Sequence, residues 1–186
     1  MLKNINIGRP HPDDKKELNH FFRAVIEDTF ANEGLSELHD DIKNEISTKI
    51  QYLQSDYDSA GTDRYFLIAK MGQTIVGTIE YGEASELIKM TTGGDLTDIH
   101  EVGTIYVHPC HQGRGIGSLL LNTMILTLLN RGIEEFCLDS GFTNAQKVWT
   151  KKLGNPDYWL KDYWGKGSDH MIWKRNVREF PIIFSV

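Results

Sequence analysis

The sequence predicts an α/β fold with a mixed sheet. Periodic patterns along the chain give the order strand, two helices, three strands, helix, strand, helix and two strands. The 186 residues are 40% hydrophobic and 25% charged, which is the size and composition of one globular domain with a single buried core. We therefore expect one domain over residues 1–176, followed by an apolar tail over residues 177–186.

One strand and two helices are predicted in the first third of the chain. Residues 5–7 alternate apolar and polar side chains and are followed directly by Gly8. After Pro12, apolar residues recur at helical spacing until Gly34, which predicts a helix. A second helix is predicted over residues 37–55, because isoleucine and leucine side chains form a stripe along one face.

A hairpin and a long loop are predicted next. Residues 65–69 and 74–81 have the pattern of strands, and the short connection between them contains Gly72. Residues 82–99 contain the pair Gly93-Gly94 and are predicted to form a loop. Loops of this length are often functional or mobile.

The middle of the chain is predicted to be a strand, a glycine-rich turn, a helix and a second strand. The first strand covers residues 101–108, and the helix covers residues 118–130. Gly132 ends the helix. Residues 136–139 then form a short apolar strand.

The last part of the chain is predicted to hold one more helix and two strands. Thr143 and Gln146 have the spacing of a capping box, and Gly154 follows two lysines at the helix end. Residues 158–164 and 170–174 have strand patterns on either side of a glycine-containing turn.

The glycine-rich segment of residues 112–117 is the most informative part of the sequence. It is predicted to lie between a strand and the N-terminus of a helix, where backbone N–H groups and the helix dipole favour an anion. Its three glycines lack the Cβ atoms that would keep a diphosphate away from the backbone. The segment therefore predicts a site for a phosphate-bearing cofactor.

Three patterns of phosphate-binding loop can be compared with this segment. The P-loop pattern G-x-x-x-x-G-K-[ST] does not occur in the sequence. The dinucleotide-binding pattern G-x-G-x-x-G would make the protein a nucleotide-dependent oxidoreductase, but Ser118 takes its sixth position and residues 109–112 separate the strand from the first glycine. The pattern Q/R-x-x-G-x-G/A fits as Gln112, Gly115 and Gly117.

This third pattern, with Val107-His108-Pro109 before it, resembles the acyl-CoA loop of the GNAT superfamily of N-acetyltransferases. The predicted order of elements over residues 5–175 also resembles the GNAT fold. The resemblance implies a mostly antiparallel central sheet flanked by helices, with strands four and five splayed apart to hold acyl-CoA. It further implies an acyltransferase that passes an acetyl group from acetyl-CoA to a primary amine of a small molecule or peptide.

The resemblance also implies which residues bind acetyl-CoA. The glycine loop would hold the diphosphate, the backbone at the end of the preceding strand would meet the pantetheine arm, and an asparagine of a later helix would contact the pantetheine region. In chain order, the expected cofactor-binding residues are Tyr106, Val107, Gln112, Gly113, Arg114, Gly115, Ile116, Gly117, Ser118 and Asn144.

Glu101 is the predicted catalytic base. It begins the strand before the glycine loop, and several GNAT enzymes have a glutamate or histidine near this position that takes the proton of the amine. An ordinary solvated carboxylate at a strand start is the alternative interpretation. Glu80, late in the preceding strand, is the second candidate, whereas His100 would point to the opposite face of a regular strand.

The acid that protonates the leaving thiolate is less well defined. Many GNAT enzymes use a tyrosine four residues before the glycine that ends the helix after strand five, but counting back from Gly154 gives Thr150. Tyr158 is the predicted catalytic acid, Tyr163 is an alternative, and the thiolate could also take its proton from water.

The two cysteines predict neither a disulfide framework nor a metal site. Cys110 lies in the glycine-loop region, where a helix N-terminus lowers the pKa of a thiol. However, the thioester would lie at the far end of the pantetheine arm, so we expect direct attack by the amine in a ternary complex. Cys137 lies in an apolar strand.

Charge and composition limit the partners. The formal net charge of −6 disfavours nucleic-acid binding, and no apolar run in the sequence is long enough to cross a membrane. The first residues contain no long apolar region, so we expect no signal peptide. We therefore expect a cytoplasmic protein, without a metal, whose acceptor is an amine. The apolar tail could pack on the domain or join two subunits into a homodimer.

Two questions remain open from the sequence. Four aromatic residues, Tyr158, Trp159, Tyr163 and Trp164, could bind an ammonium group by cation–π contact or could be half-buried strand positions. The absence of the family tyrosine keeps a second function open, namely a non-catalytic acyl-CoA-binding or sensor protein of the same fold.

Overall fold

The computed structural model describes residues 4–183. The strands are β1 (Ile5–Gly8), β2 (Arg64–Met71), β3 (Thr74–Glu83), β4 (His100–Val107), β5 (Glu135–Ser140), β6 (Tyr158–Leu160) and β7 (His170–Asn176). The helices are α1 (Lys15–Asn32), α2 (His39–Asp58), α3 (Glu86–Thr91), α4 (Ile116–Asn130) and α5 (Thr143–Leu153), with short 3-10 helices η1 (Pro12–Asp14), η2 (Pro109–His111) and η3 (Val177–Glu179).

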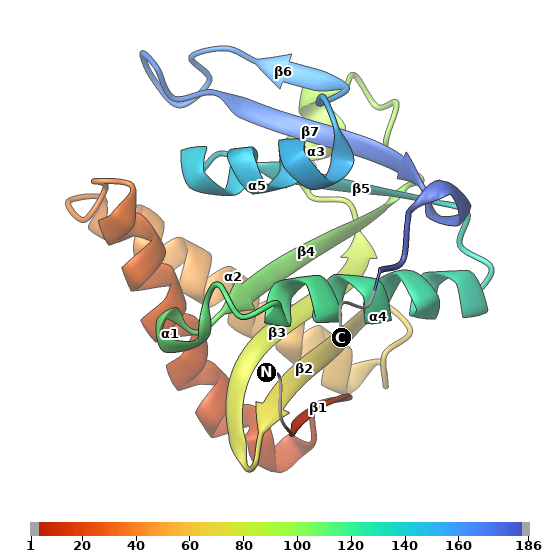
Figure 1. Ribbon diagram of the computed structural model, residues 1–186. Coiled ribbons are helices and arrows are strands. Elements are labelled where there is room, and N and C mark those ends of the chain that lie inside the picture. Colours follow the sequence, from red (N-terminus) through yellow and green to blue (C-terminus); the bar gives the residue numbers. More distant parts are fainter. Residues whose placement is uncertain (1–3, 184–186) are drawn as a thin grey trace. The chain divides into compact units, whose positions relative to one another are not determined.

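The strands form one seven-stranded sheet with the order β1-β2-β3-β4-β5-β7-β6 (Figure 1). β4 pairs in parallel with β5, whereas β1 with β2, β5 with β7 and β6 with β7 pair in antiparallel fashion. The mixed, mostly antiparallel sheet with flanking helices confirms the predicted fold class. The β4–β5 ladder consists of two residue pairs, His100 with Phe136 and Glu101 with Cys137.

The described chain divides into two compact units. Unit 1 contains residues 4–81, 104–127 and 182–183, and unit 2 contains Gly82–Gly103 and Leu128–Pro181. Two strands and one helix, β3, β4 and α4, run from one unit into the other. The glycine loop belongs to unit 1, and Glu101 belongs to unit 2.

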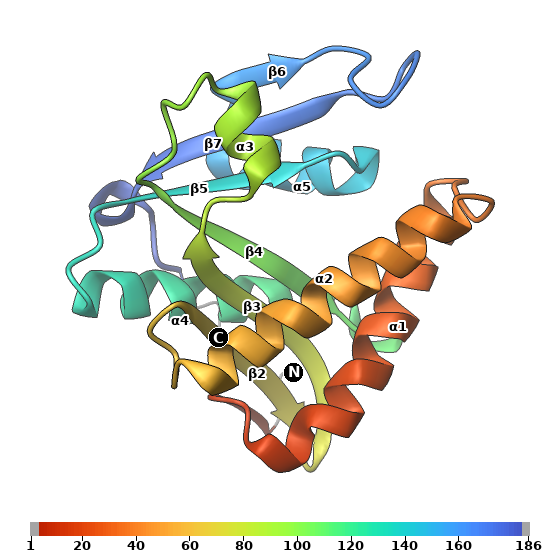
Figure 2. The same cartoon turned by 180° about the vertical axis from the view of Figure 1, so that it is seen from behind.

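Helices cover both faces of the sheet in unit 1. α1 and α2 lie over one face and the unit 1 part of α4 lies over the other, as the two opposite views show (Figures 1 and 2). The buried face of α1 consists of the residues whose spacing predicted the helix: Leu18, Phe21, Phe22, Val25, Ile26 and Phe30. Gly77 of β3 lets α4 approach closely, because a Cβ there would lie 2.9 Å from Leu120 Cδ1 and 3.1 Å from the Tyr106 carbonyl oxygen.

We expect Gly77→Ala to destabilise the protein by about 1–3 kcal/mol, since overpacking a filled interior costs this much. The carbonyl oxygen of Tyr106 is part of β4 and can move only with the strand. The midpoint of urea unfolding measures the effect. Gly8→Ala is the matched control, because a Cβ at Gly8 meets nothing within 4 Å. Equal midpoints for the two variants would contradict the prediction.

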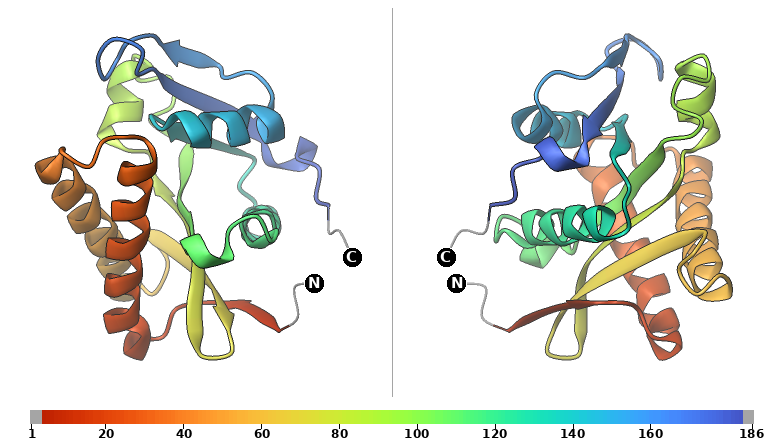
Figure 3. Two further views of the ribbon diagram at one scale, coloured as in Figure 1. Left: turned by 60° about the vertical axis from the view of Figure 1, so that its left-hand side comes forward. Right: turned by 90° about the vertical axis from the view of Figure 1, so that its right-hand side faces the viewer.

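Helices also cover both faces of the sheet in unit 2. α3 lies on one side of β5 and β7, and α5 lies on the other (Figure 3, right). The buried side chains between α3 and the strands form one apolar cluster: Ala84, Ile88, Leu96, Cys137 and Ile172, with Ile99 and Tyr158 packed against it.

The prediction of a loop over residues 82–99 was wrong. β3 continues to Glu83, and α3 follows directly. Ser85 caps α3, because its hydroxyl accepts a hydrogen bond from the backbone N–H of Ile88 at 3.4 Å. Ile88 is fully buried, so tertiary packing stabilises a helix that is too short to be stable alone.

Three other local predictions need correction. No capping box forms at the start of α5: its N-cap is Phe142, and Gln146 donates instead to the carbonyl oxygens of Ser140 and Asp169. The strand expected over residues 158–164 ends at Leu160. The helix expected from residue 118 begins at Ile116, so Gly117 lies in its first turn.

The C-terminal tail makes contacts in each unit. In unit 2, Val177 is buried, and the ring of Phe180 packs edge-on against Phe136 with 6.3 Å between the ring centroids. Aromatic pairs prefer this geometry at about 4.5–7 Å. In unit 1, Asn122 donates a hydrogen bond of 2.6 Å to the Ile183 carbonyl oxygen. Residues 1–3 and 184–186, parts of the predicted N-terminus and tail, lie outside the described residues. Within residues 4–183, no helix is long and apolar enough to cross a membrane.

Candidate functional site

The glycine loop has the backbone geometry of a tight turn into a helix. β4 ends at Val107, η2 follows, and α4 begins at Ile116. Gly113 and Gly115 have φ angles of 71° and 83°, a region that glycine enters without steric cost. The side-chain amide of Gln112 donates a hydrogen bond of 3.1 Å to the Val107 carbonyl oxygen and thereby ties the loop to the strand.

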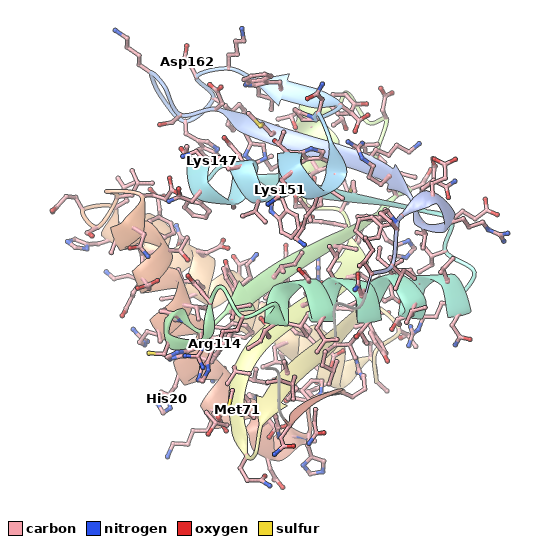
Figure 4. All side chains as sticks on the ribbon, viewed as in Figure 1. His20, Met71, Arg114, Lys147, Lys151 and Asp162 are labelled. Atoms are coloured by element: carbon pink, nitrogen blue, oxygen red, sulfur yellow. The ribbon has the colours of Figure 1, made fainter. Side chains whose placement is uncertain are left out.

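The loop also has the electrostatic character of an anion site. The first intrahelical bond of α4 joins the Leu119 N–H to the Gly115 carbonyl oxygen at 3.0 Å, so helix geometry leaves the N–H groups of Ile116 and Gly117 without an acceptor inside the helix. Residues 102–133 contain no aspartate or glutamate. Arg114 is exposed on the segment that leads into α4 (Figure 4). The loop can therefore accept a phosphate group.

Gly117 does not have a positive φ angle, so its small size matters more for phosphate binding than its backbone conformation does. A Cβ at Gly117 would lie 3.6 Å from Val107 Cγ2, which is an ordinary contact. An alanine therefore fits at this position, whereas a larger or acidic side chain would extend over the helix N-terminus. This agrees with a loop pattern that allows either glycine or alanine at its last position.

The end of β4 carries the two residues predicted to meet the pantetheine arm. The hydroxyl of Tyr106 donates a hydrogen bond of 2.9 Å to Glu45 of α2, so this side chain is engaged with the helix layer. The predicted role of Tyr106 and Val107 is a backbone role, which this arrangement permits.

Glu80, the second candidate for the base, is fully buried in unit 1. Its Oε1 accepts a hydrogen bond of 3.1 Å from the Thr104 hydroxyl, and its Oε2 accepts one of 2.8 Å from Arg64. Burial raises the pKa of Glu80, and the charge of Arg64 opposes this rise. The carboxylate is thus enclosed by β2, β3 and β4, which disfavours contact with an acceptor amine.

Glu101, the first candidate for the base, lies in β4 within unit 2. Only 6% of its surface is exposed, and its Oε2 accepts a hydrogen bond of 2.7 Å from the backbone N–H of Ser85. It is not the solvated carboxylate that the alternative interpretation described. The expected alternation along β4 is interrupted, because Thr104 has a φ angle of 51°.

Tyr158, the predicted acid, lies in β6 and donates a hydrogen bond of 3.2 Å to Asp95. Burial raises the pKa of Tyr158, and the hydrogen bond to Asp95 raises it further. Because β5 and β7 lie between β4 and β6, Tyr158 is three strand spacings, or about 14 Å, from Glu101 across the sheet.

The two predicted catalytic residues share a structural role. Glu101 binds Ser85 at the start of α3, and Tyr158 binds Asp95 just beyond its end. Together they hold the two ends of the segment that contains α3.

The remaining predicted residues are distributed over both units. Asn144 and Thr150 are exposed on α5. Burial lowers the pKa of His100. Cys110 is exposed, and its backbone N–H donates to His108 Nδ1 at 3.3 Å, whereas Cys137 is fully buried and burial raises the pKa of its thiol. In the part of the chain that the structure describes, no group of three or more His, Cys, Asp or Glu side chains is arranged to hold a metal ion.

A buried histidine in unit 2 is a polar feature that the sequence did not reveal. The indole N–H of Trp164 donates to His170 Nδ1 at 3.1 Å, so Nδ1 is an acceptor and Nε2 carries the proton. Nε2 lies 3.0 Å from Asp139 Oδ2 and donates to it. Gly141 allows this contact, since a Cβ there would lie 2.7 Å from Trp164 Nε1. Trp164 therefore has one edge fixed while much of its surface is exposed.

One comparison with known proteins identifies a family. Residues 29–154 match the family described as acetyltransferase (GNAT) family. Among curated proteins, the sequence has no match. Solved structures share the fold at low sequence identity.

The PaiA N-acetyltransferase of Thermoplasma acidophilum, in complex with coenzyme A, is 19% identical, with a TM-score of 0.66 over 93% of this chain and 99% of that chain. The ribosomal-protein-alanine N-acetyltransferase of Brucella melitensis is 20% identical, with a TM-score of 0.65 over 92% and 99%. The protein yncA of Salmonella typhimurium, with its cofactor acetyl-CoA, is 16% identical, with a TM-score of 0.67 over 99% and 100%.

Proposed function

The chain belongs to the GNAT family of acetyltransferases, and on this premise we propose that it transfers an acetyl group from acetyl-CoA to a primary amine of a small molecule or peptide. The observation that carries the proposal is the glycine loop. Two left-handed glycines, Gly113 and Gly115, lead into the N-terminus of α4 in a segment without acidic residues. N-Acetyltransferases with this fold, one of them bound to coenzyme A, support the reaction type.

The backbone of Gln112–Ser118 would bind the diphosphate of acetyl-CoA. Its N–H groups and the dipole of α4 favour negative charge at this position. The backbone of Tyr106 and Val107 would meet the pantetheine arm, and Asn144 would contact the pantetheine region from α5. The thioester of the bound cofactor supplies an activated acetyl group.

Glu101 would act as the base that takes the proton of the acceptor amine. The hydrogen bond from the Ser85 N–H fixes the orientation of its carboxylate, and an oriented base is what proton transfer requires. The amine would attack the thioester carbonyl directly. Neither cysteine is suited to carry the acetyl group, because Cys137 is fully buried and Cys110 would lie at the diphosphate end of the bound cofactor.

We expect Tyr158→Phe to change kcat by less than about threefold at neutral pH. The raised pKa and the hydrogen bond to Asp95 disfavour proton donation by Tyr158. A thiolate leaving group can take its proton from water and does not require a side-chain acid. Steady-state kinetics check this expectation. A loss of about 10² or more, the usual size of a general-acid effect, would instead establish Tyr158 as the acid.

A non-catalytic acyl-CoA sensor is the second candidate function. It is favoured by the burial of the Glu80 carboxylate against Arg64, and by Thr150 at the position of the family tyrosine. A sensor would bind acetyl-CoA without releasing coenzyme A in the presence of any amine.

Thiol release from acetyl-CoA, measured against a panel of small amines and peptides, tests the proposal. Amine-dependent release with intersecting initial-rate plots is the expected result, since direct transfer passes through a ternary complex. Parallel plots would indicate an acetyl-enzyme. Tight acetyl-CoA binding by calorimetry without release would favour the sensor, and stabilisation by NAD but not acetyl-CoA in a thermal-shift assay would contradict both functions.

A further inference from the structure

Thr104 has an unusual backbone conformation inside a strand. Its φ angle is 51°, although it is a β-branched residue within β4 and is buried. Side chains of this kind rarely adopt the left-handed region, so β4 departs from regular extended geometry at this residue. Such a conformation persists only where the surrounding structure determines it.

Three buried side chains of β2 and β3 hold the backbone conformation of Thr104. The Thr104 hydroxyl donates a hydrogen bond of 3.1 Å to Glu80, and the Thr104 carbonyl oxygen accepts one of 2.8 Å from the Thr78 hydroxyl. Arg64 donates to the other oxygen of Glu80 at 2.8 Å. Thr104 is therefore held through its side chain and through its backbone.

The network continues through α2 and returns to β4. The guanidinium of Arg64 stacks over the ring of Tyr52 at 3.4 Å, and the ammonium of Lys49 lies 5.2 Å from the same ring. Lys49 forms an ion pair of 3.2 Å with Glu45, which accepts the hydrogen bond of Tyr106. The network therefore contacts β4 at Thr104 and at Tyr106. Its two carboxylates are matched in number by the two cations, Arg64 and Lys49.

We propose that Thr104, held by Glu80 and Arg64, sets the path of β4 and thereby positions the backbone groups of Tyr106 and Val107 for the pantetheine arm of acyl-CoA. All of these residues belong to unit 1. Thr104 is a positioning residue in this arrangement, because it acts through the strand that follows it. The inference rests on the proposed function, since it assumes that an acyl-CoA binds along β4.

The test compares two ligands that share the diphosphate. Acetyl-CoA has the pantetheine arm, and 3′-phosphoadenosine 5′-diphosphate lacks it. Thr104→Val removes the hydroxyl at nearly constant volume and leaves a buried oxygen of Glu80 without this donor. We expect calorimetry to show an affinity for acetyl-CoA about tenfold lower, with an unchanged affinity for the nucleotide. Thr104→Ser keeps the hydroxyl and should restore the affinity for acetyl-CoA.

Two further variants separate positioning from stability. Thr92→Val is the matched control, because Thr92 is also buried and its hydroxyl donates at 2.8 Å to the Ile88 carbonyl oxygen, away from β4. It should leave both affinities unchanged. If Thr104→Val does not fold, Glu80→Gln replaces it, since its amide would face the Arg64 guanidinium and disturb the same network.

The outcomes distinguish this inference from the proposed function. Equal losses for both ligands, or no loss for acetyl-CoA, would overturn the positioning role while leaving the acetyltransferase proposal intact. Wild-type protein that binds neither ligand would overturn both.

Discussion

Gly117→Asp is expected to weaken acetyl-CoA binding by about 100-fold or more while the protein stays folded. The backbone of Gly117 lies in the first turn of α4, and a Cβ fits there, so the aspartate itself causes little strain. Its carboxylate would lie beside the position proposed for the diphosphate. Repulsion between charges about 5 Å apart near a protein surface amounts to about 3 kcal/mol, or a loss of about 100-fold or more in affinity.

The same substitution should not weaken the fold, because an acidic side chain at a helix N-terminus is favourable. Isothermal calorimetry measures the affinity, and circular dichroism monitors the fold. Gly117→Ala is the matched control and should bind nearly as well as the wild type. Gly115→Asp should lose binding as well, with additional backbone strain from a φ angle of 83°. Tight binding by Gly117→Asp would refute the assignment of the loop.

Glu101→Gln is expected to lower kcat by about 10²–10⁴-fold at neutral pH, the usual contribution of a general base. The amide oxygen can still accept the hydrogen bond from the Ser85 N–H, so α3 should stay in place and the affinity for acetyl-CoA should hold. The deficit should shrink as the pH rises, because a growing fraction of the acceptor amine is already neutral and needs no base.

Glu83→Gln is the control for this variant. Glu83 lies at the end of β3, is exposed and pairs with Lys89, so its loss should leave kcat unchanged. Thermal unfolding of both variants separates a catalytic effect from a structural one. Near-full activity of Glu101→Gln below neutral pH would place the base elsewhere. If the loss of activity in Glu101→Gln is accounted for by the loss of folded protein in the thermal unfolding measurement, Glu101 serves only to hold Ser85.

The sequence by itself determined the parts of this protein that depend on the spacing of apolar residues and on backbone conformation at single residues. Helical spacing of apolar residues located α1, since a buried face repeats every 3.6 residues and is visible without a partner. Glycines at 113 and 115 located the turn into α4, because few other residues adopt its positive φ angles. The family resemblance that these patterns carried was confirmed by the match over residues 29–154.

Only the tertiary structure decided what the polar side chains do. Glu80 finds its partners 16 and 24 residues away, and Tyr106 finds Glu45 at a separation of 61 residues. Such pairs leave no periodic signal in the sequence. For the same reason, the sequence did not predict α3, whose six residues are too few to show a helical pattern. The burial of Ile88 and the hydrogen bonds of Ser85 to Glu101 and of Tyr158 to Asp95 come from long-range packing.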